Sequence, residues 1–226
     1  MKKTGKCILV CAGDMGEEEI LYKEGDFLIA VDGGLEHLCR RHMVPDYILG
    51  DFDSLKEEYF SILSAFREKH PEEVTTLPVE KDDTDTVAAA RLGLDRGFCD
   101  FIIYGGLGGR RLDHTLANIQ TLVFLKRQGA GALLTGQGTD LFVLSGESIA
   151  FEGDFEGTFS LFALDPEVKG VTIRGMKYPL ENGTLTSSFP LGVSNQWAAE
   201  EAEISVREGI LTLVLSRLPE QAPENC

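Results

Sequence analysis

The feature that most constrains the fold is a change of hydrophobic pattern partway along the 226-residue chain. In the first half, apolar runs of strand length alternate with segments whose apolar residues recur at helical spacing. The apolar runs occupy residues 7–12, 27–31, 47–49, 74–77 and 101–104. Such alternation predicts a parallel sheet that is covered by helices.

After about Gly129 the short apolar runs continue, but the long helical patterns disappear. These runs lie at residues 133–134, 141–144, 159–163, 171–173, 204–206 and 211–215, and Gly, Asn, Asp and Pro separate them. This pattern is typical of an antiparallel sandwich or barrel. We therefore expect an α/β domain with a Rossmann-like parallel sheet over residues 1–130, an all-β sandwich domain over 131–218 and a frayed tail over 219–226.

The charge balance disfavours two classes of partner. The chain has 21 Lys and Arg against 37 Asp and Glu, for a formal charge of −16, so it would repel nucleic acids and anionic membrane surfaces. No stretch approaches the roughly 20 apolar residues of a membrane helix. The five cysteines form no Cys-x-x-Cys pair, which favours a reducing, cytoplasmic location.

Two carboxylates follow the short apolar run at residues 47–49. Asp51 and Asp53 are two positions apart, so in an extended chain both side chains point to the same side. Neighbouring anions repel unless a cation lies between them, and Mg²⁺ prefers oxygen ligands. The alternative is that Asp53 or Ser54 caps a helix beginning near Leu55, while Asp51 is only a turn residue.

A second acidic cluster, over residues 81–86, opens the helix expected at 87–97. Asp and Thr at a helix start satisfy free backbone amides, so Thr84 and its neighbours have a capping interpretation. Four such residues exceed what one cap requires. Open α/β sheets bind ligands at the carboxyl ends of their strands, so Asp85 could complete a carboxylate cage with the pair after the third strand.

A glycine-rich segment follows the fifth expected strand. Four glycines lie within residues 105–109, and Arg110 and Arg111 come next. Glycines allow a ligand to approach the backbone, and guanidinium groups fork onto phosphate oxygens, so this segment predicts a phosphate-binding loop. It matches neither the dinucleotide fingerprint nor a P-loop. His114 and Asn118 share one helical face, where solvated or capping roles are the alternative.

The turn Asp32-Gly33-Gly34 follows the second expected strand, and a simple tight turn also explains its glycines. Four polar or glycine-rich clusters thus follow four strands of one predicted sheet. Because parallel strands end at a common edge, all four clusters would meet there. This convergence favours a ligand site over four unrelated turns.

Six motifs that carry these features follow one another along the chain. They are Val31-Asp32-Gly33-Gly34, Pro45 through Ser54, Lys81-Asp82-Asp83-Thr84-Asp85, Gly106 through His114, Gly175 through Leu180, and Val193-Ser194-Asn195. In this order and spacing they resemble the motifs of thiamine pyrophosphokinases. The resemblance covers nearly the whole chain.

The resemblance implies an enzyme that transfers pyrophosphate from ATP to the hydroxyl of thiamine, giving thiamine diphosphate and AMP. It implies Mg²⁺ on Asp51, Asp53 and Asp85. The positions that it assigns to the nucleotide and catalytic site are Asp32, Gly33, Thr84, Gly106, Gly108, Arg110, Arg111, Asp113 and His114. Those that it assigns to thiamine are Tyr178, Ser194 and Asn195.

Several points stay open at this level. Either Arg110 or Arg111 grips phosphate, and either Asp113 or another carboxylate accepts the hydroxyl proton. The resemblance also implies a homodimer with thiamine at the subunit interface. Two alternative functions are a pyrophosphokinase acting on a different alcohol and a non-catalytic nucleotide sensor.

Overall fold

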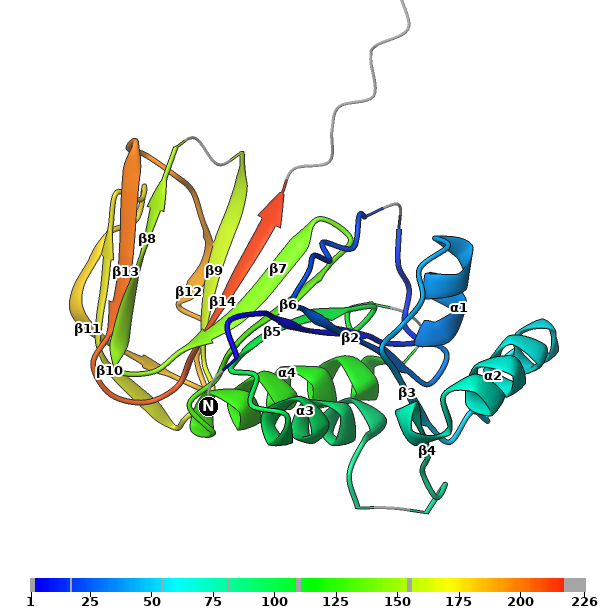
Figure 1. The fold of residues 1–226 in the computed structure, drawn as a ribbon. Coiled ribbons are helices and arrows are strands. Elements are labelled where there is room, and N and C mark those ends of the chain that lie inside the picture. Colours follow the sequence, from blue (N-terminus) through cyan, green and yellow to red (C-terminus); the bar gives the residue numbers. More distant parts are fainter. Residues whose placement is uncertain are drawn as a thin grey trace, which may run out of the picture. The chain divides into compact units, whose positions relative to one another are not determined.

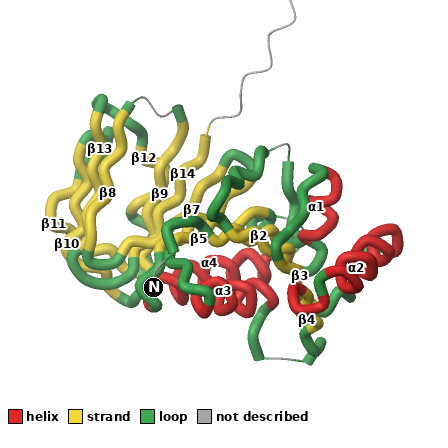
Figure 2. The backbone as a smooth tube through the Cα atoms, viewed as in Figure 1, coloured by secondary structure: helices red, strands yellow, loops and turns green. Residues whose placement is uncertain are grey.

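The computed structural model describes residues 3–16, 18–53, 55–80, 82–108, 111–153 and 156–217. The chain divides into two compact units between Gln137 and Gly138. Within the described residues, α-helices occur in the first unit and the second is built from strands (Figures 1 and 2). The expected domain boundary at residue 130 stays a prediction, and the expected tail at 219–226 lies outside the described residues.

The elements of the first unit are β1 (Cys7–Val10), β2 (Phe27–Val31), α1 (Gly34–Arg40), β3 (Tyr47–Gly50), α2 (Glu57–Lys69), η1 (Pro71–Glu73), β4 (Val74–Thr76), α3 (Asp85–Asp95), β5 (Asp100–Tyr104), α4 (Leu112–Arg127) and β6 (Gly131–Gly136). Those of the second unit are β7 (Thr139–Leu144), β8 (Glu147–Glu152), β9 (Gly157–Ala163), β10 (Glu167–Arg174), β11 (Leu180–Thr186), β12 (Gly192–Asn195), β13 (Glu201–Val206) and β14 (Leu211–Arg217).

The first unit is a parallel sheet with the strand order β6-β5-β1-β2-β3-β4. The chain builds this sheet outward from β1 to β4 and then returns to the other side of β1 with β5. At such a reversal the connections after two adjacent strands, here β1 and β5, leave in opposite directions. Open α/β sheets bind ligands in the crevice that this creates at the carboxyl ends of the strands. The Rossmann-like sheet predicted from the alternating pattern is confirmed.

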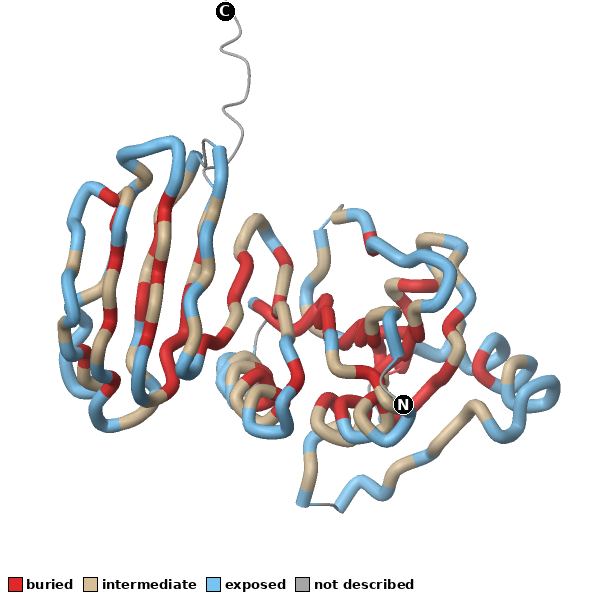
Figure 3. Tube along the Cα trace, turned by 60° about the vertical axis from the view of Figure 1, so that its left-hand side comes forward, coloured by how far each residue is buried: buried red, intermediate tan, exposed pale blue. Residues whose placement is uncertain are grey.

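Helices cover both faces of this sheet. Alternate residues of a strand point to opposite faces, and in the central strands the residues on both faces are apolar, so both faces need to be covered. Val10 packs in a buried cluster with Leu35 and Leu38 of α1. On the other face, α3 approaches so closely that a Cβ on Gly93 would lie 2.6 Å from the Sγ of Cys7. Helices α3 and α4 lie side by side on that face (Figure 1). The central strands are consequently buried along their whole length (Figure 3).

The second unit is a sandwich of antiparallel strands. One layer has the order β12-β9-β14-β7 and the other β11-β10-β13-β8. Buried apolar residues of both layers form one core, and the indole ring of Trp197 packs edge-on against Phe151 and Phe159. Along β13 every second residue is buried, and along β8 half-buried residues alternate with exposed ones, as two-layer packing requires (Figure 3). The all-β sandwich prediction is confirmed.

Local details differ from the sequence-based expectations. Residues 133–134, grouped with the antiparallel half by their turn-rich surroundings, lie in β6, which pairs in parallel with β5. Helix α2 begins at Glu57 after the N-cap residue Lys56, with no side-chain cap, so Asp53 does not cap it. Strands β8, β11 and β12 were missed because their sequences are polar or short. None of the helices in the described ranges combines the length and apolar character needed to cross a membrane.

Candidate active site

Asp32 organises two neighbouring turns at the carboxyl edge of the parallel sheet. It follows β2 with a left-handed φ of 51°, and its backbone N–H donates to the carbonyl of Leu49 at 2.8 Å. Its Oδ1 accepts the N–H of Phe52 at 3.1 Å. This approach needs a glycine at position 50, because a Cβ on Gly50 would lie 2.8 Å from the Cα of Asp32. Asp32 therefore holds the turn after β3 as well as its own.

Three carboxylates converge where β2 and β3 end. One oxygen from each of Asp32, Asp51 and Asp53 lies within 4.8 Å of the other two. Repulsion from Asp51 is the main cause of a raised pKa at Asp53, and burial, Asp32 and Asp85 add to it. A cation would relieve this repulsion, and carboxylate oxygens are the donors that Mg²⁺ prefers. We call these three residues the carboxylate cluster; its residues fit a magnesium ion.

Asp85 and Thr84 lie at the start of α3. Thr84 caps this helix, because its Oγ1 accepts the N–H of Val87 at 3.3 Å. The charge of Asp85 contributes to the raised pKa of both Asp53 and Cys11, so it acts on the same edge of the sheet. The group within 4.8 Å nevertheless contains Asp32 in place of Asp85. The sequence had assigned Asp32 to the nucleotide rather than to the metal.

Arg111 and Asp113 form a two-pronged ion pair before and within the first turn of α4. The contacts are 2.6 Å from Nη2 to Oδ2 and 3.3 Å from Nε to Oδ1. The hydrogen bonds from Arg111 are the main cause of a lowered pKa at Asp113. The negative charge of Asp53 also adds to the raised pKa of Arg111, so the guanidinium interacts electrostatically with the carboxylate cluster. His114 donates its backbone N–H to the carbonyl of Arg111 at 3.1 Å.

The described part of the glycine-rich segment is fixed by contacts from two other elements. The N–H of Gly13, in the turn after β1, donates to the carbonyl of Gly105 at 2.9 Å. The buried side-chain amide of Asn118 in α4 donates to the carbonyl of Gly106 at 2.9 Å. Gly108 has a left-handed φ of 72°, which favours glycine. This anchoring by Asn118 went unpredicted, although its helical face was noted.

One predicted position of this loop, Arg110, lies outside the described residues, as does its neighbour Gly109. The choice between Arg110 and Arg111 as the phosphate ligand therefore stays a prediction.

Gly33, which was predicted to lie in the nucleotide site, precedes α1, and its carbonyl accepts the N–H of Glu36 at 3.0 Å.

The residues predicted to bind thiamine lie in the second unit. Asn195 is buried, and both polar atoms of its side chain are hydrogen-bonded to backbone: Oδ1 accepts the N–H groups of Tyr178 and Gln196 at 3.0 and 2.9 Å, and Nδ2 donates to the carbonyl of Tyr178 at 2.8 Å. The side chain of Tyr178 is 60% exposed. Ser194 has a left-handed φ of 58° and donates its N–H to Ser160 Oγ at 3.0 Å. Asn195 thus fixes the Tyr178 turn, while the exposed ring of Tyr178 has the ammonium of Lys177 over its face, 5.5 Å from the ring centroid.

Two family models match the chain in succession. Residues 19–134, more than half of the chain, match the model described as the thiamin pyrophosphokinase catalytic domain. The chain belongs to the thiamin pyrophosphokinase family. Residues 148–211 match the model described as the vitamin B1 binding domain of the same family. The carboxylate cluster falls in the first matched region, and Tyr178 and Asn195 fall in the second.

Individual relatives agree with this assignment. A thiamine pyrophosphokinase of Bacillus subtilis is 29% identical over 189 residues, which is 83% of this chain and 86% of the relative. A crystal structure of thiamine pyrophosphokinase from Bacillus subtilis has a TM-score of 0.80 at 26% identity and covers 93% of this chain and 99% of its own. A thiamin pyrophosphokinase structure from Geobacillus thermodenitrificans, at 24% identity and a TM-score of 0.80, covers 96% and 100% and shares the fold.

Proposed function

We propose that this chain transfers the pyrophosphoryl group of ATP to the primary hydroxyl of thiamine, producing thiamine diphosphate and AMP. The observation that carries the proposal is the carboxylate cluster at the sheet edge of a chain that matches both domains of the thiamin pyrophosphokinase family in order. In this transfer the thiamine oxygen forms a bond to the β-phosphorus of ATP. The bond between the β-phosphorus and the α–β bridging oxygen breaks, and AMP leaves with that oxygen. The proton of the thiamine hydroxyl is proposed to pass to a carboxylate at the sheet edge.

The residues proposed to hold Mg²⁺ are Asp51 and Asp53, with Asp32 and Asp85 at the same edge. Asp32 is included because one of its carboxylate oxygens lies within 4.8 Å of those of Asp51 and Asp53. Asp85 is included because it matches the metal-binding motif of the family. When bound, Mg²⁺ neutralises phosphate charge and orients the phosphate oxygens. The raised pKa of Asp53 marks a site where negative charge is crowded before any cation or nucleotide binds.

The role proposed for Arg111 is to bind phosphate oxygens through the guanidinium N–H groups other than the two that Asp113 accepts. Asp113 orients the guanidinium, because it accepts hydrogen bonds from Nε and Nη2. A carboxylate whose pKa is lowered is a weak proton acceptor, so the proposed role of Asp113 is to orient Arg111 rather than to take the hydroxyl proton. Backbone amides of the segment that includes Gly106 and Gly108 supply further donors to phosphate.

On the thiamine side, the exposed ring of Tyr178 is proposed to stack against the cationic thiazolium ring. Asn195 is proposed to support this contact indirectly, because its polar atoms already bond to the backbone of Tyr178 and Gln196. Ser194, on the edge strand β12, is the remaining residue proposed to bind thiamine directly.

We further propose a cytoplasmic homodimer in which thiamine lies at the subunit interface. Phe189 and Leu191, which precede β12, and Val193 within it are exposed, and apolar side chains in such numbers are typical of a surface that another chain covers. The cysteines in the described ranges are free thiols, in keeping with a reducing compartment. Sedimentation of the purified protein tests the dimer directly, and a monomer at micromolar concentration would contradict it.

The activity is tested by mixing the protein with ATP, Mg²⁺ and thiamine and separating the products. Stoichiometric AMP and thiamine diphosphate are expected. Nucleotide binding without products would favour a sensor, and products formed only with another alcohol would favour a pyrophosphokinase of different acceptor specificity. Either outcome would overturn thiamine as the substrate.

A further inference from the structure

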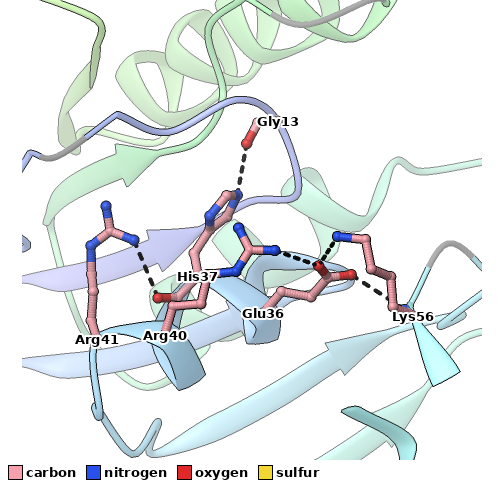
Figure 4. Close-up of polar contacts among 6 residues, drawn as sticks. All are labelled: Gly13, Glu36, His37, Arg40, Arg41 and Lys56. Carbon is pink, nitrogen blue, oxygen red and sulfur yellow. Dashed lines mark hydrogen bonds and ion pairs between the residues drawn. The ribbon is translucent and has the colours of Figure 1, made fainter. Parts of the chain in front are cut away.

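Helix α1 carries a carboxylate that the proposed chemistry does not use. Glu36 is 7% exposed, although it lies on the helix that follows Asp32. Its Oε2 is 2.6 Å from the ammonium of Lys56 and 3.3 Å from the guanidinium of Arg40 (Figure 4). Its Oε1 accepts the backbone N–H of Lys56 at 3.2 Å. A buried carboxylate needs such partners, because burial without them would strongly destabilise its charge.

The partner of Glu36 occupies a particular place in the chain. Lys56 is the residue before α2, at the end of the loop that carries Asp51 and Asp53. The beginning of that loop is held by the bond from Phe52 N–H to Asp32 Oδ1. The loop is therefore tied at both ends to one continuous segment, the turn at Asp32 and the helix that follows it.

This double attachment opposes a force within the loop. Asp51 and Asp53 repel each other because their carboxylate oxygens lie within 4.8 Å of one another, and two like charges on a short loop favour conformations that separate them. A buried, hydrogen-bonded anchor outside the cluster limits that movement. Groups that orient metal ligands from outside commonly change metal affinity when removed.

The same helix also holds the turn after β1. His37 Nε2 lies 2.8 Å from the carbonyl of Gly13, with which it shares a hydrogen bond (Figure 4). The N–H of Gly13 donates to the carbonyl of Gly105. One turn of α1 thus contacts the carboxylate loop through Glu36 and the glycine-rich segment through His37 and Gly13. This shared attachment distinguishes the contacts of α1 from an isolated surface ion pair.

We propose that Glu36 is a positioning residue, which holds Lys56 against α1 and so keeps Asp51 and Asp53 arranged to bind a divalent cation. Any effect of Glu36 on turnover rests on the proposed function. The arrangement of the loop and its affinity for a cation are measurable without turnover, so the two proposals can fail separately.

The main test replaces Glu36 with leucine, which removes both acceptors at similar volume. In the metal-free protein, amide hydrogen exchange over residues 50–56 is expected to become about 10-fold faster or more, and the Kd for Mn²⁺, followed by its electron paramagnetic resonance, to rise about 10-fold. The matched control is Asp46→Leu. Asp46 accepts the N–H of Leu28 and the hydroxyl of Tyr22 before β3, away from the cluster, so this variant is expected to retain Mn²⁺ affinity.

A double-mutant cycle keeps the proposal testable if Glu36→Leu does not fold. Glu36→Gln and Lys56→Met each remove the ion pair but retain the backbone hydrogen bond, and each is expected to raise the Mn²⁺ Kd about 2- to 3-fold. The double variant is expected to be no worse than either single one. Lys56→Arg is expected to restore the wild-type affinity.

Unchanged exchange and Mn²⁺ affinity in the Glu36 variants would overturn the positioning role. An equal loss of affinity in Asp46→Leu would overturn it too, because that result would reflect general destabilisation. If the wild-type protein forms no thiamine diphosphate but these binding differences appear, the proposed function fails while the positioning role stands.

Discussion

In the α/β unit, charge is concentrated: the carboxylates of Asp32, Asp51 and Asp53 share a space less than 5 Å across. In the β unit, the corresponding predicted site presents the neutral, exposed ring of Tyr178 over a turn that buried Asn195 holds. Asp32 both fixes a turn and adds charge to its site, whereas in the β unit the fixing and the presenting residues are different. In the β unit, substitutions should therefore distinguish the residue that fixes the turn from the residue that contacts thiamine more clearly than substitutions of Asp32 can in the α/β unit.

The largest expected effect is the loss of turnover in Asp53→Asn. The substitution keeps the size of the side chain but removes a charge from the carboxylate cluster, so kcat is expected to fall about 10³-fold while the fold is retained. AMP release and circular dichroism measure the two quantities. The control is Asp83→Asn, which removes an exposed partner of Arg91 outside the cluster and should retain turnover. Wild-type AMP release from Asp53→Asn would contradict the role of Asp53.

The next largest effect is expected in the β unit, from substitution of Asn195. Asn195→Leu removes three hydrogen bonds and leaves backbone groups of Tyr178 without their partners, so thiamine KM is expected to rise about 30-fold, with a loss of stability of about 2–4 kcal/mol. Asn195→Asp, which keeps the acceptor but loses the donor, should be intermediate. Initial-rate kinetics and urea unfolding measure both. A large KM change without any loss of stability would instead indicate direct contact between Asn195 and thiamine.

A smaller effect is expected at Tyr178, which presents its ring without fixing the turn. Tyr178→Ala should raise thiamine KM about 10-fold through loss of the cation–π contact and leave stability unchanged. Tyr178→Phe retains the ring and should stay within about 2- to 3-fold of the wild type. If Tyr178→Ala has an unchanged thiamine KM, stacking by this residue is wrong.

The two units also differ in how much of them the sequence predicts. The parallel strands were located because buried central strands are continuous apolar runs. Their order was not predicted, because the position of a run along the chain does not reveal that β5 pairs with β1 rather than with β4. The pairing of β6 with β5 was not predicted, since a short apolar run does not reveal its partner strand. In the β unit, strands such as β11 have few apolar residues, so alternation was too weak to detect.

Within the site, motif order predicted the participating segments but not every contact. Asp32 joins the carboxylate cluster because its left-handed backbone and the absence of a side chain at Gly50 bring two turns together. Neither condition is visible in residue spacing. Glu36 gave no signal at all, since a glutamate between apolar helix residues looks like an exposed position until the fold buries it beside Lys56.

The smallest expected effect concerns the stability of the metal-free protein. The pKa of Asp53 is raised in the folded state, mainly by Asp51, so its protonated form favours folding. That contribution is present below the ordinary carboxyl pKa and is lost as pH rises through the raised value. Asp53→Asn removes the repulsion, so at pH 7 in EDTA this variant is expected to melt about 1–3 °C above the wild type, a difference that should vanish in acid.

Magnesium should reverse this order. Added Mg²⁺ stabilises the folded state in proportion to its affinity, so it is expected to raise the Tm of the wild type more than that of Asp53→Asn. Differential scanning fluorimetry from pH 4 to 7.5, with EDTA or Mg²⁺, measures both trends. If Asp53→Asn melts below the wild type in EDTA at pH 7, crowded charge does not destabilise the metal-free site. The carboxylate cluster and the Tyr178 site would then differ only in the ligands that they bind, because neither would contain charge repulsion that destabilises the metal-free protein.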